Sequence, residues 1–545
     1  MSDKAASVPW LARLFPLALA LSWLADYLFW DKPDGISFPI FIALALGLGF
    51  WLARQAHAVP HRHALWLLAP IAFFALMSIL RVELMTVLLS RVLTLFLMAL
   101  LAASFLGGRW PEYGLGDLID KLVTFVPKGL GRYRAARDEQ ESKQSDWRRA
   151  GPILRGLLLA APILIVLGSL LASADPFFGD WLDDLLSFLD IENVAEYLLR
   201  VALILMVANL LVGAYVYALQ ASEDRKLVGE AKPILSPFLG IGESATILGS
   251  VNLLFVAFVT FQFQYLFGGE RNINFAGYTY AEYARRGFGE MVFVAFLVLL
   301  LFILLSQVAN RESRMERKTY SWLGVALFAL VAVILASAYQ RLLLYESAYG
   351  FSQIRIYSHT FMIWLGLLLA AIVVLEIKEH QRAFGLAMLG AVVGFAATLG
   401  AINVDGFIIH ANLERARLGY ELNGDPDSYR YQEVDFDYLV DLSTDAVPAL
   451  AQEFNRAVAD EDRQLQTLTA AVLICHAARN DGYANFQHRQ SWQASGSRAA
   501  RIWADLQENE AFVALDYRVE WYPSYRASLH FGELEFDCGY APGLR

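Results

Sequence analysis

The chain has little charge and almost no cysteine for its length. Only 18% of its 545 residues are Asp, Glu, Lys or Arg, and cysteine occurs only at positions 475 and 538. So few thiols exclude a disulfide-rich scaffold and any metal site built from several cysteines. The sequence also contains no P-loop, HExxH, GxSxG or CxxC motif. NTPases, zinc proteases, serine hydrolases and thiol oxidoreductases therefore lose their usual sequence signatures.

No lysine follows Lys378, and the last part of the chain is acidic. Residues 405–545 contain 23 Asp and Glu against 12 Arg and no Lys. A segment with this charge repels nucleic acid and anionic headgroups, so neither is expected as its partner. Cys475 and Cys538 both fall in this segment. They are candidates for a disulfide, and two small buried thiols are the alternative that their spacing leaves open.

Long apolar runs fill most of the chain before this acidic segment. Because about 20 apolar residues cross the hydrocarbon core as a helix, we expect about eleven membrane spans. The runs are too long for barrel strands and do not alternate, so the fold class is an all-α transmembrane helical bundle. The expected spans are 11–30, 36–53, 63–80, 84–106, 152–173, 197–219, 244–266, 288–308, 320–340, 358–377 and 384–403.

The loops between the spans differ in charge, and this difference predicts the orientation. Loop 107–151 carries a group of arginines, whereas loop 174–196 has seven carboxylates and no base. Basic loops stay in the cytoplasm, which places the N-terminus inside. An odd number of spans then places residues 404–545 outside. The sequence predicts a multi-pass protein of the bacterial inner membrane with a periplasmic C-terminal domain.

Four parts follow from this topology. They are transmembrane helices one to four (1–106), a cytoplasmic connector (107–151), transmembrane helices five to eleven with outer loops 174–196, 267–290 and 341–357 (152–403), and an acidic extracytoplasmic domain (404–545). Helical patterning continues through much of the last part. From Ala511 to Phe536 it gives way to strand-like residues, so we expect a mostly α domain that ends in a small β element.

Two of the outer loops contain the charged residues that we predict to form a ligand site. These residues are Glu282, Arg286, Glu290, Arg341, Glu346 and Arg355. The first three follow one another at i, i+4 spacing, so alternating charges line one helix face as it enters the membrane. If the two loops meet, the six residues form one cluster able to bind an anionic lipid or solute. The alternative is that these charges only fix the helix ends.

No metal or cofactor is expected. His57, His61 and His63 lie close together in the first cytoplasmic loop, but no cysteine or carboxylate lies beside them. A metal site needs three or four converging ligands, so an ordinary loop is the better interpretation.

Four blocks resemble a known family. They read ERNINFAGYTYAEYARRGF, LYESAYGFSQIRIY, NVDGFIIHANLERARLG and VDFDYLVDLSTDAVPAL, and they lie between residues 270 and 450. They are similar to a bacterial inner-membrane family classified as domain of unknown function 4153/4173. The resemblance covers about the second half of the chain. It implies a polytopic membrane protein with an exported tail, and it implies no catalytic residue.

Three classes of function fit these observations. The first is a non-enzymatic protein that handles or senses an envelope component, by transport or by binding a lipid or a protein partner. The second is a membrane-embedded transferase that uses a lipid-linked sugar donor, which rests on architecture alone. The third is a structural envelope scaffold. Under any of these functions, the expected partners of the protein are the lipid bilayer, an anionic lipid or solute on the outer side, and an envelope protein.

Overall fold

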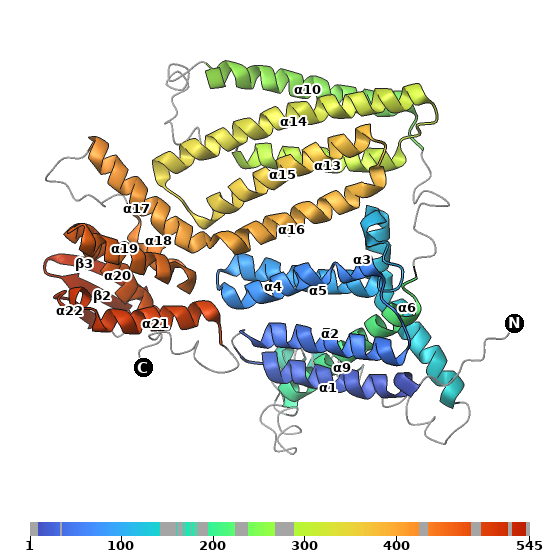
Figure 1. Ribbon diagram of the computed structural model, residues 1–545, viewed down its shortest axis with the longest axis horizontal. Helices are drawn as coiled ribbons and strands as arrows, with labels where there is room; N and C mark the ends of the chain where they lie inside the picture. Colours follow the sequence, from blue (N-terminus) through green and yellow to red (C-terminus); the bar gives the residue numbers. More distant parts are fainter. Residues whose placement is uncertain are drawn as a thin grey trace. The chain divides into compact units, whose positions relative to one another are not determined.

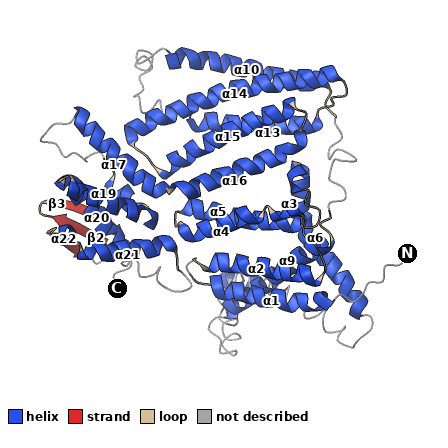
Figure 2. Ribbon diagram, in the orientation of Figure 1, coloured by secondary structure: helices blue, strands red, loops and turns tan. Residues whose placement is uncertain are grey.

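A computed structural model gives the fold. It describes residues 9–32, 35–141, 160, 167–168, 171–175, 177–179, 181, 194–223, 238–267, 288–423, 434–480, 492–521 and 526–540. Apart from one three-stranded sheet, the regular elements in these ranges are helices (Figures 1 and 2). The chain divides into two compact units. One consists of Met1–Ala69, Phe96–Trp110 and Ile119–Arg225, the other of Pro70–Leu95, Pro111–Leu118 and Lys226–Arg545.

Within the described residues, ten helices are long and apolar enough to cross a membrane. They are Trp10–Phe29, Ser37–Gln55, Arg62–Leu80, Leu84–Ala103, Glu196–Gln220, Ile241–Phe261, Gly289–Val308, Arg314–Ser347, Gln353–Ile377 and Phe384–Ile402. Each coincides with one of the expected spans. Most of the remaining expected span, 152–173, lies outside the described residues. The chain is a multi-pass membrane protein.

The first unit contains α1 (Pro9–Phe29), α2 (Ser37–Gln55), α3 (Arg62–Leu65), most of α6 (Leu115–Glu141) and α9 (Val194–Gln220). Two polar contacts join these apolar helices. Arg200 on α9 donates to both carboxylate oxygens of Asp26 on α1, at 3.1 and 2.6 Å. Tyr215 on α9 donates its hydroxyl to the Ala45 carbonyl of α2 at 2.8 Å. Because hydrocarbon offers no competing partner, such contacts fix which helix faces meet.

The helices α4 (Leu68–Leu80) and α5 (Leu84–Ala103) contribute residues to both units. The second unit also holds α10 (Ile241–Phe267), α13 (Phe288–Val308), α14 (Arg314–Tyr349), α15 (Gln353–Ile377), α16 (Phe384–Ile402) and α17 (Val404–Asn423). In this unit α10, α14, α15 and α16 run side by side, with α13 against α14 (Figure 1). Short 3₁₀ turns at Trp110–Glu112, Gln381–Ala383 and Thr444–Ala446 connect longer elements.

Helix α14 is longer than the span expected from the sequence. It begins with a capping box, in which Ser313 and Glu316 exchange hydrogen bonds with each other's backbone N–H groups. It continues to Tyr349 and stops at Gly350, whose φ of 75° suits glycine. The segment 341–357, expected as an outer loop, is therefore helical except for residues 350–352. Helical structure continues beyond the apolar run because Leu342 and Glu346 remain buried against neighbouring helices.

The C-terminal part contains α18 (Phe436–Asp441), α19 (Val447–Ala459), α20 (Arg463–Arg479), α21 (Ala494–Glu508) and α22 (Glu510–Val513). An antiparallel sheet follows, formed by β1 (Arg518–Trp521), β2 (Arg526–Phe531) and β3 (Leu534–Tyr540) in that order. The predicted small β element is thus confirmed. The hydrophobic core of this part includes Phe454 and Leu473 and extends without a break to Ile356, Leu399 and Ile408. The core therefore reaches α15, α16 and α17.

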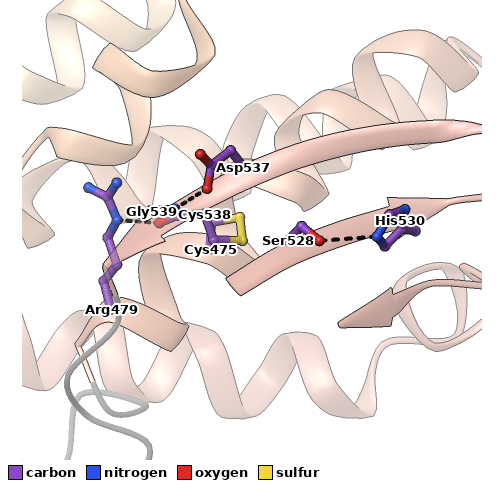
Figure 3. Close-up of a disulfide and its surroundings, with 7 residues drawn as sticks. All are labelled: Cys475, Arg479, Ser528, His530, Asp537, Cys538 and Gly539. Atoms are coloured by element: carbon purple, nitrogen blue, oxygen red, sulfur yellow. Dashed lines mark hydrogen bonds between the residues drawn. A yellow bond between two sulfur atoms is a disulfide. The ribbon is translucent and has the colours of Figure 1, made fainter. Parts of the chain in front are cut away.

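A disulfide fastens the sheet to the helices. It joins Cys475 on α20 to Cys538 on β3, and both side chains are fully buried. Figure 3 shows Arg479, one turn after Cys475, donating from Nε to the Cys538 carbonyl at 2.6 Å. The two cysteines are 63 residues apart, so the bond closes a long loop of the unfolded chain.

Removing this disulfide is expected to destabilise the C-terminal part by about 2–4 kcal/mol, because the unfolded chain regains the freedom of the closed loop. A Cys538→Ala variant should show faster amide exchange in β2 and β3. The wild type treated with a membrane-permeant reductant should behave in the same way, while the Cys538→Ala variant should not respond to reduction. Equal protection of the two strands in reduced and oxidised wild type would contradict the expectation.

Candidate functional site

Charged and polar residues of the second unit gather where α14 ends, α15 begins and α16 passes into α17. We call this the tail-side end of the unit, defined by residues 350–352 and Asn403. Three groups of residues lie there: a groove with two charged side chains, a buried Glu–His pair, and a network that joins the helices to the C-terminal part.

The groove lies between α10, α13 and α14 and encloses a volume of about 380 Å³. Its apolar lining consists of Leu254, Phe255, Phe258, Met291, Val294 and Ile334, and its charged lining consists of Glu290 and Arg341. Glu290 lies in the first turn of α13, where the helix dipole favours a carboxylate. Leu254 and Phe258 are 64% and 37% exposed, so part of the wall faces the hydrocarbon. The groove combines an apolar wall with one acid and one base.

The Glu–His pair lies between α14 and α15. Glu346 Oε2 is 2.7 Å from His359 Nε2, and the ring of Tyr339 packs edge-on against the imidazole at 4.8 Å. Glu346 is only 2% exposed. The second carboxylate oxygen of Glu346 and Nδ1 of His359 are buried without a hydrogen-bond partner among the described residues. Buried polar atoms are nearly always paired, so these two atoms are suited to bind a small polar ligand.

Arg355 has a different environment. Its guanidinium donates to the carbonyls of Tyr349 and Gly350 at the end of α14, the first at 3.0 Å. It also lies over the ring of Tyr345, 4.3 Å from the centroid. A cation at a helix C-terminus stabilises the last carbonyl groups. Arg355 therefore holds the α14–α15 turn in place.

The structure thus places four of the six predicted ligand residues, and it distributes them over three environments. Glu290 and Arg341 line the same groove, whereas Glu346 pairs with His359 and Arg355 caps α14. Glu282 and Arg286 lie outside the described residues. No group of three or more His, Cys, Asp or Glu within the described ranges could hold a metal ion.

The third group was not predicted from the sequence. We call Arg81, Glu83, Tyr357, Asp405 and Asp445 the junction cluster. Its three carboxylates are buried: Asp405 is 0% exposed, Asp445 3% and Glu83 4%. The Glu83 carboxylate accepts from the N–H groups of the first turn of α5 at 2.6 and 2.8 Å, and from the Tyr357 hydroxyl. It therefore caps α5 and holds α15 beside it.

Asp405 and Asp445 connect the C-terminal part to the helices. Asp405 accepts from the side chain of Gln353 at 2.7 Å and from the backbone N–H of Ser443 at 2.8 Å. Burial raises the pKa of the Asp405 carboxyl, and these two hydrogen bonds act in the opposite direction. Arg81 donates to the Gly400 carbonyl at 2.8 Å, and burial lowers its pKa while the charge of Asp445 raises it. The junction cluster therefore joins the C-terminal part to the membrane helices through polar groups that have hydrogen-bond partners.

In the sequence, only the positions of the charged residues relative to the spans indicate the junction cluster. Asp405 directly follows the last apolar span, and Arg81 and Glu83 interrupt the apolar sequence between two spans. Charges at such positions are common at helix ends. Nothing in their spacing indicates that residues more than 300 positions apart meet.

These features define the class of the protein: a multi-pass integral membrane protein whose helices enclose an apolar groove with a charged end. Residues 17–453 match the family described as Domain of unknown function (DUF4153), and the chain belongs to this family. The match extends from α1 into α19, which confirms the resemblance of the blocks between residues 270 and 450. No curated protein and no solved structure matches the chain.

Proposed function

We propose that the protein is a non-enzymatic component of the bacterial inner membrane that binds an envelope lipid with a phosphate-bearing headgroup in the groove between α10, α13 and α14. The observation that carries this proposal is the composition of the groove: among the described residues that line it, six are apolar and two, Glu290 and Arg341, are charged. Its volume of about 380 Å³ is within the range of ligand sites.

The arrangement of the lining fits an amphipathic ligand. Leu254 and Phe258 are open to the hydrocarbon, so an acyl chain can enter from the bilayer without crossing water. Arg341 supplies a charge-assisted donor for a phosphate, which is a geometry that guanidinium groups favour. Glu290 carries the opposite charge to Arg341. A headgroup with both a phosphate and an ammonium group could therefore pair its phosphate with Arg341 and its ammonium with Glu290.

We also propose an orientation with the N-terminus in the cytoplasm and the C-terminal part in the periplasm, across eleven spans. The N–H groups of Leu106 and Gly107, just after α5, donate to Ser222, just after α9, at 2.9 and 2.8 Å. Both helices thus end on one side of the membrane. Since α9 itself crosses, this arrangement supports one further crossing between α5 and α9, as eleven spans require. The buried disulfide of the C-terminal part supports an oxidising compartment.

Native mass spectrometry of protein extracted gently from its own membrane tests the lipid proposal. We expect the wild type to retain one lipid of defined mass, and Arg341→Ala to lower its occupancy by about tenfold or more. Arg314→Ala is the matched control, because it removes the same charge from the opposite, exposed end of α14. Equal occupancy in the two variants, or a wild type that retains no lipid, would overturn the proposal.

A further inference from the structure

A second cavity lies in the first unit, between α6 and the end of α9. It encloses about 470 Å³ and is lined by Lys128, Gly131, Arg132, Ala135, Tyr217 and Ala221. Among the described residues that line it, the two charged ones are both cations. It contains none of the residues assigned to the groove.

Helix α6 packs directly against the backbone of α9. A Cβ atom added to Gly129 would lie 1.9 Å from the Gly213 carbonyl oxygen, so only glycine permits this approach. The rings of Phe125 and Tyr217 also meet edge-on at 6.2 Å. Gly213 lies seven residues before the end of α9 at Gln220, which corresponds to about 10 Å along the helix axis. The two helices therefore cross within about the last two turns of the membrane-crossing helix α9, close to the end of that span.

The outward face of α6 is apolar near its start. Ile119 and Val123, four residues apart, are 65% and 67% exposed. The helix is too polar to cross the bilayer and is not among the membrane-crossing helices. A helix of this composition at this depth lies along the interface, with its exposed apolar side chains in the acyl region.

The cations of the cavity, Lys128 and Arg132, lie nine residues further along α6 than Ile119 and Val123, on another face of the helix. Arg132 donates one guanidinium N–H to the Gln220 carbonyl, which fixes it beside the end of α9. The Lys128 ammonium is 3.5 Å from Asp120, and its side chain is 53% exposed. A soluble anion would use the cations alone. A phospholipid uses the cations for its phosphate and the apolar face for its chains.

We infer that α6 and the end of α9 form a binding site for the headgroup of an anionic phospholipid, in the leaflet where α9 ends. Lys128 and Arg132 hold the phosphate, and Ile119 and Val123 lie among the acyl chains. This site is independent of the groove, so it remains testable if the groove binds nothing.

The full-length protein in nanodiscs of equal parts phosphatidylglycerol and phosphatidylcholine provides the test. Native mass spectrometry is expected to show phosphatidylglycerol retained preferentially by the wild type. Lys128→Gln combined with Arg132→Gln should lower this retention by about tenfold or more. The control variant, Arg134→Gln combined with Arg137→Gln, removes the same charge from the same helix away from the cavity lining and should retain the lipid.

Three results would overturn the inference. One is equal loss of phosphatidylglycerol from both double variants, which would indicate general attraction to a basic surface. Another is no preference of the wild type for phosphatidylglycerol. The third is displacement of the lipid by millimolar inorganic phosphate, which would identify a site for a soluble anion.

Discussion

Replacing Arg311 with Met is expected to lower the free energy of unfolding by about 3–5 kcal/mol. Arg311 Nη1 is 2.9 Å from Glu376 Oε1, and the two side chains are 8% and 2% exposed. Without the guanidinium, the Glu376 carboxylate would remain buried without its opposite charge. That loss is larger than the value of any exposed ion pair, which is about 1 kcal/mol at most.

The surroundings of this pair add to the expected effect. Arg311 also donates to the Ser306 carbonyl at 2.7 Å and lies over the ring of Tyr320, 4.0 Å from its centroid. Ser321 donates to the same oxygen of Glu376 at 3.1 Å. These contacts join the end of α13, the start of α14 and the end of α15. The pair therefore locks three membrane helices at the end opposite the tail-side end.

Unfolding of the purified protein in increasing SDS measures the effect. The Arg311→Met and Glu376→Leu variants should each unfold at lower SDS than the wild type. The variant with both changes should be more stable than either, because no buried charge is left unpaired. Arg314→Met, at an exposed position in the same region, controls for the loss of one basic residue and should match the wild type. Additive losses in the double variant would contradict the explanation.

The membrane helices could be predicted because their length and composition are set locally by the bilayer. A helix that crosses hydrocarbon must be apolar for about 20 residues, and each such run is visible in the sequence without knowledge of its neighbours. Helix ends were harder to place. The continuation of α14 to Tyr349 depends on packing of Leu342 and Glu346 against other helices, which hydropathy does not record.

The candidate site was less predictable because it, too, depends on how separate helices pack against one another. Local spacing drew attention to Glu290 and Arg341, and both line the groove, but its apolar wall comes from three separate helices. The sequence does not indicate the contact between His359 and Glu346, because it depends on how α14 and α15 pack after the turn at Gly350. In the junction cluster, Asp445 accepts from the backbone N–H of Val82, which is 363 positions earlier in the chain. Periodicity in one sequence carries no information about such pairs.

Replacing Asp445 with Ala is expected to loosen the joint between the C-terminal part and the helices. Its Oδ2 atom accepts from the backbone N–H groups of Val82 and Glu83 at 2.8 and 3.2 Å, and the residue is 3% exposed. Each buried N–H that loses its acceptor costs about 1–3 kcal/mol. The charge that opposes Arg81 is lost as well.

Hydrogen exchange of the full-length protein distinguishes loosening of this joint from general destabilisation. In Asp445→Ala the amides of Val82 and Glu83 should exchange faster, while those of α14 should keep their wild-type protection. Asp445→Asn retains an acceptor oxygen without the charge, so its effect should be intermediate. Asp437→Ala removes an equal charge from an exposed position nearby and should leave both amides protected. Because the carboxylate acts on two backbone groups directly, unchanged exchange of Val82 and Glu83 in Asp445→Ala would show that other contacts hold the joint.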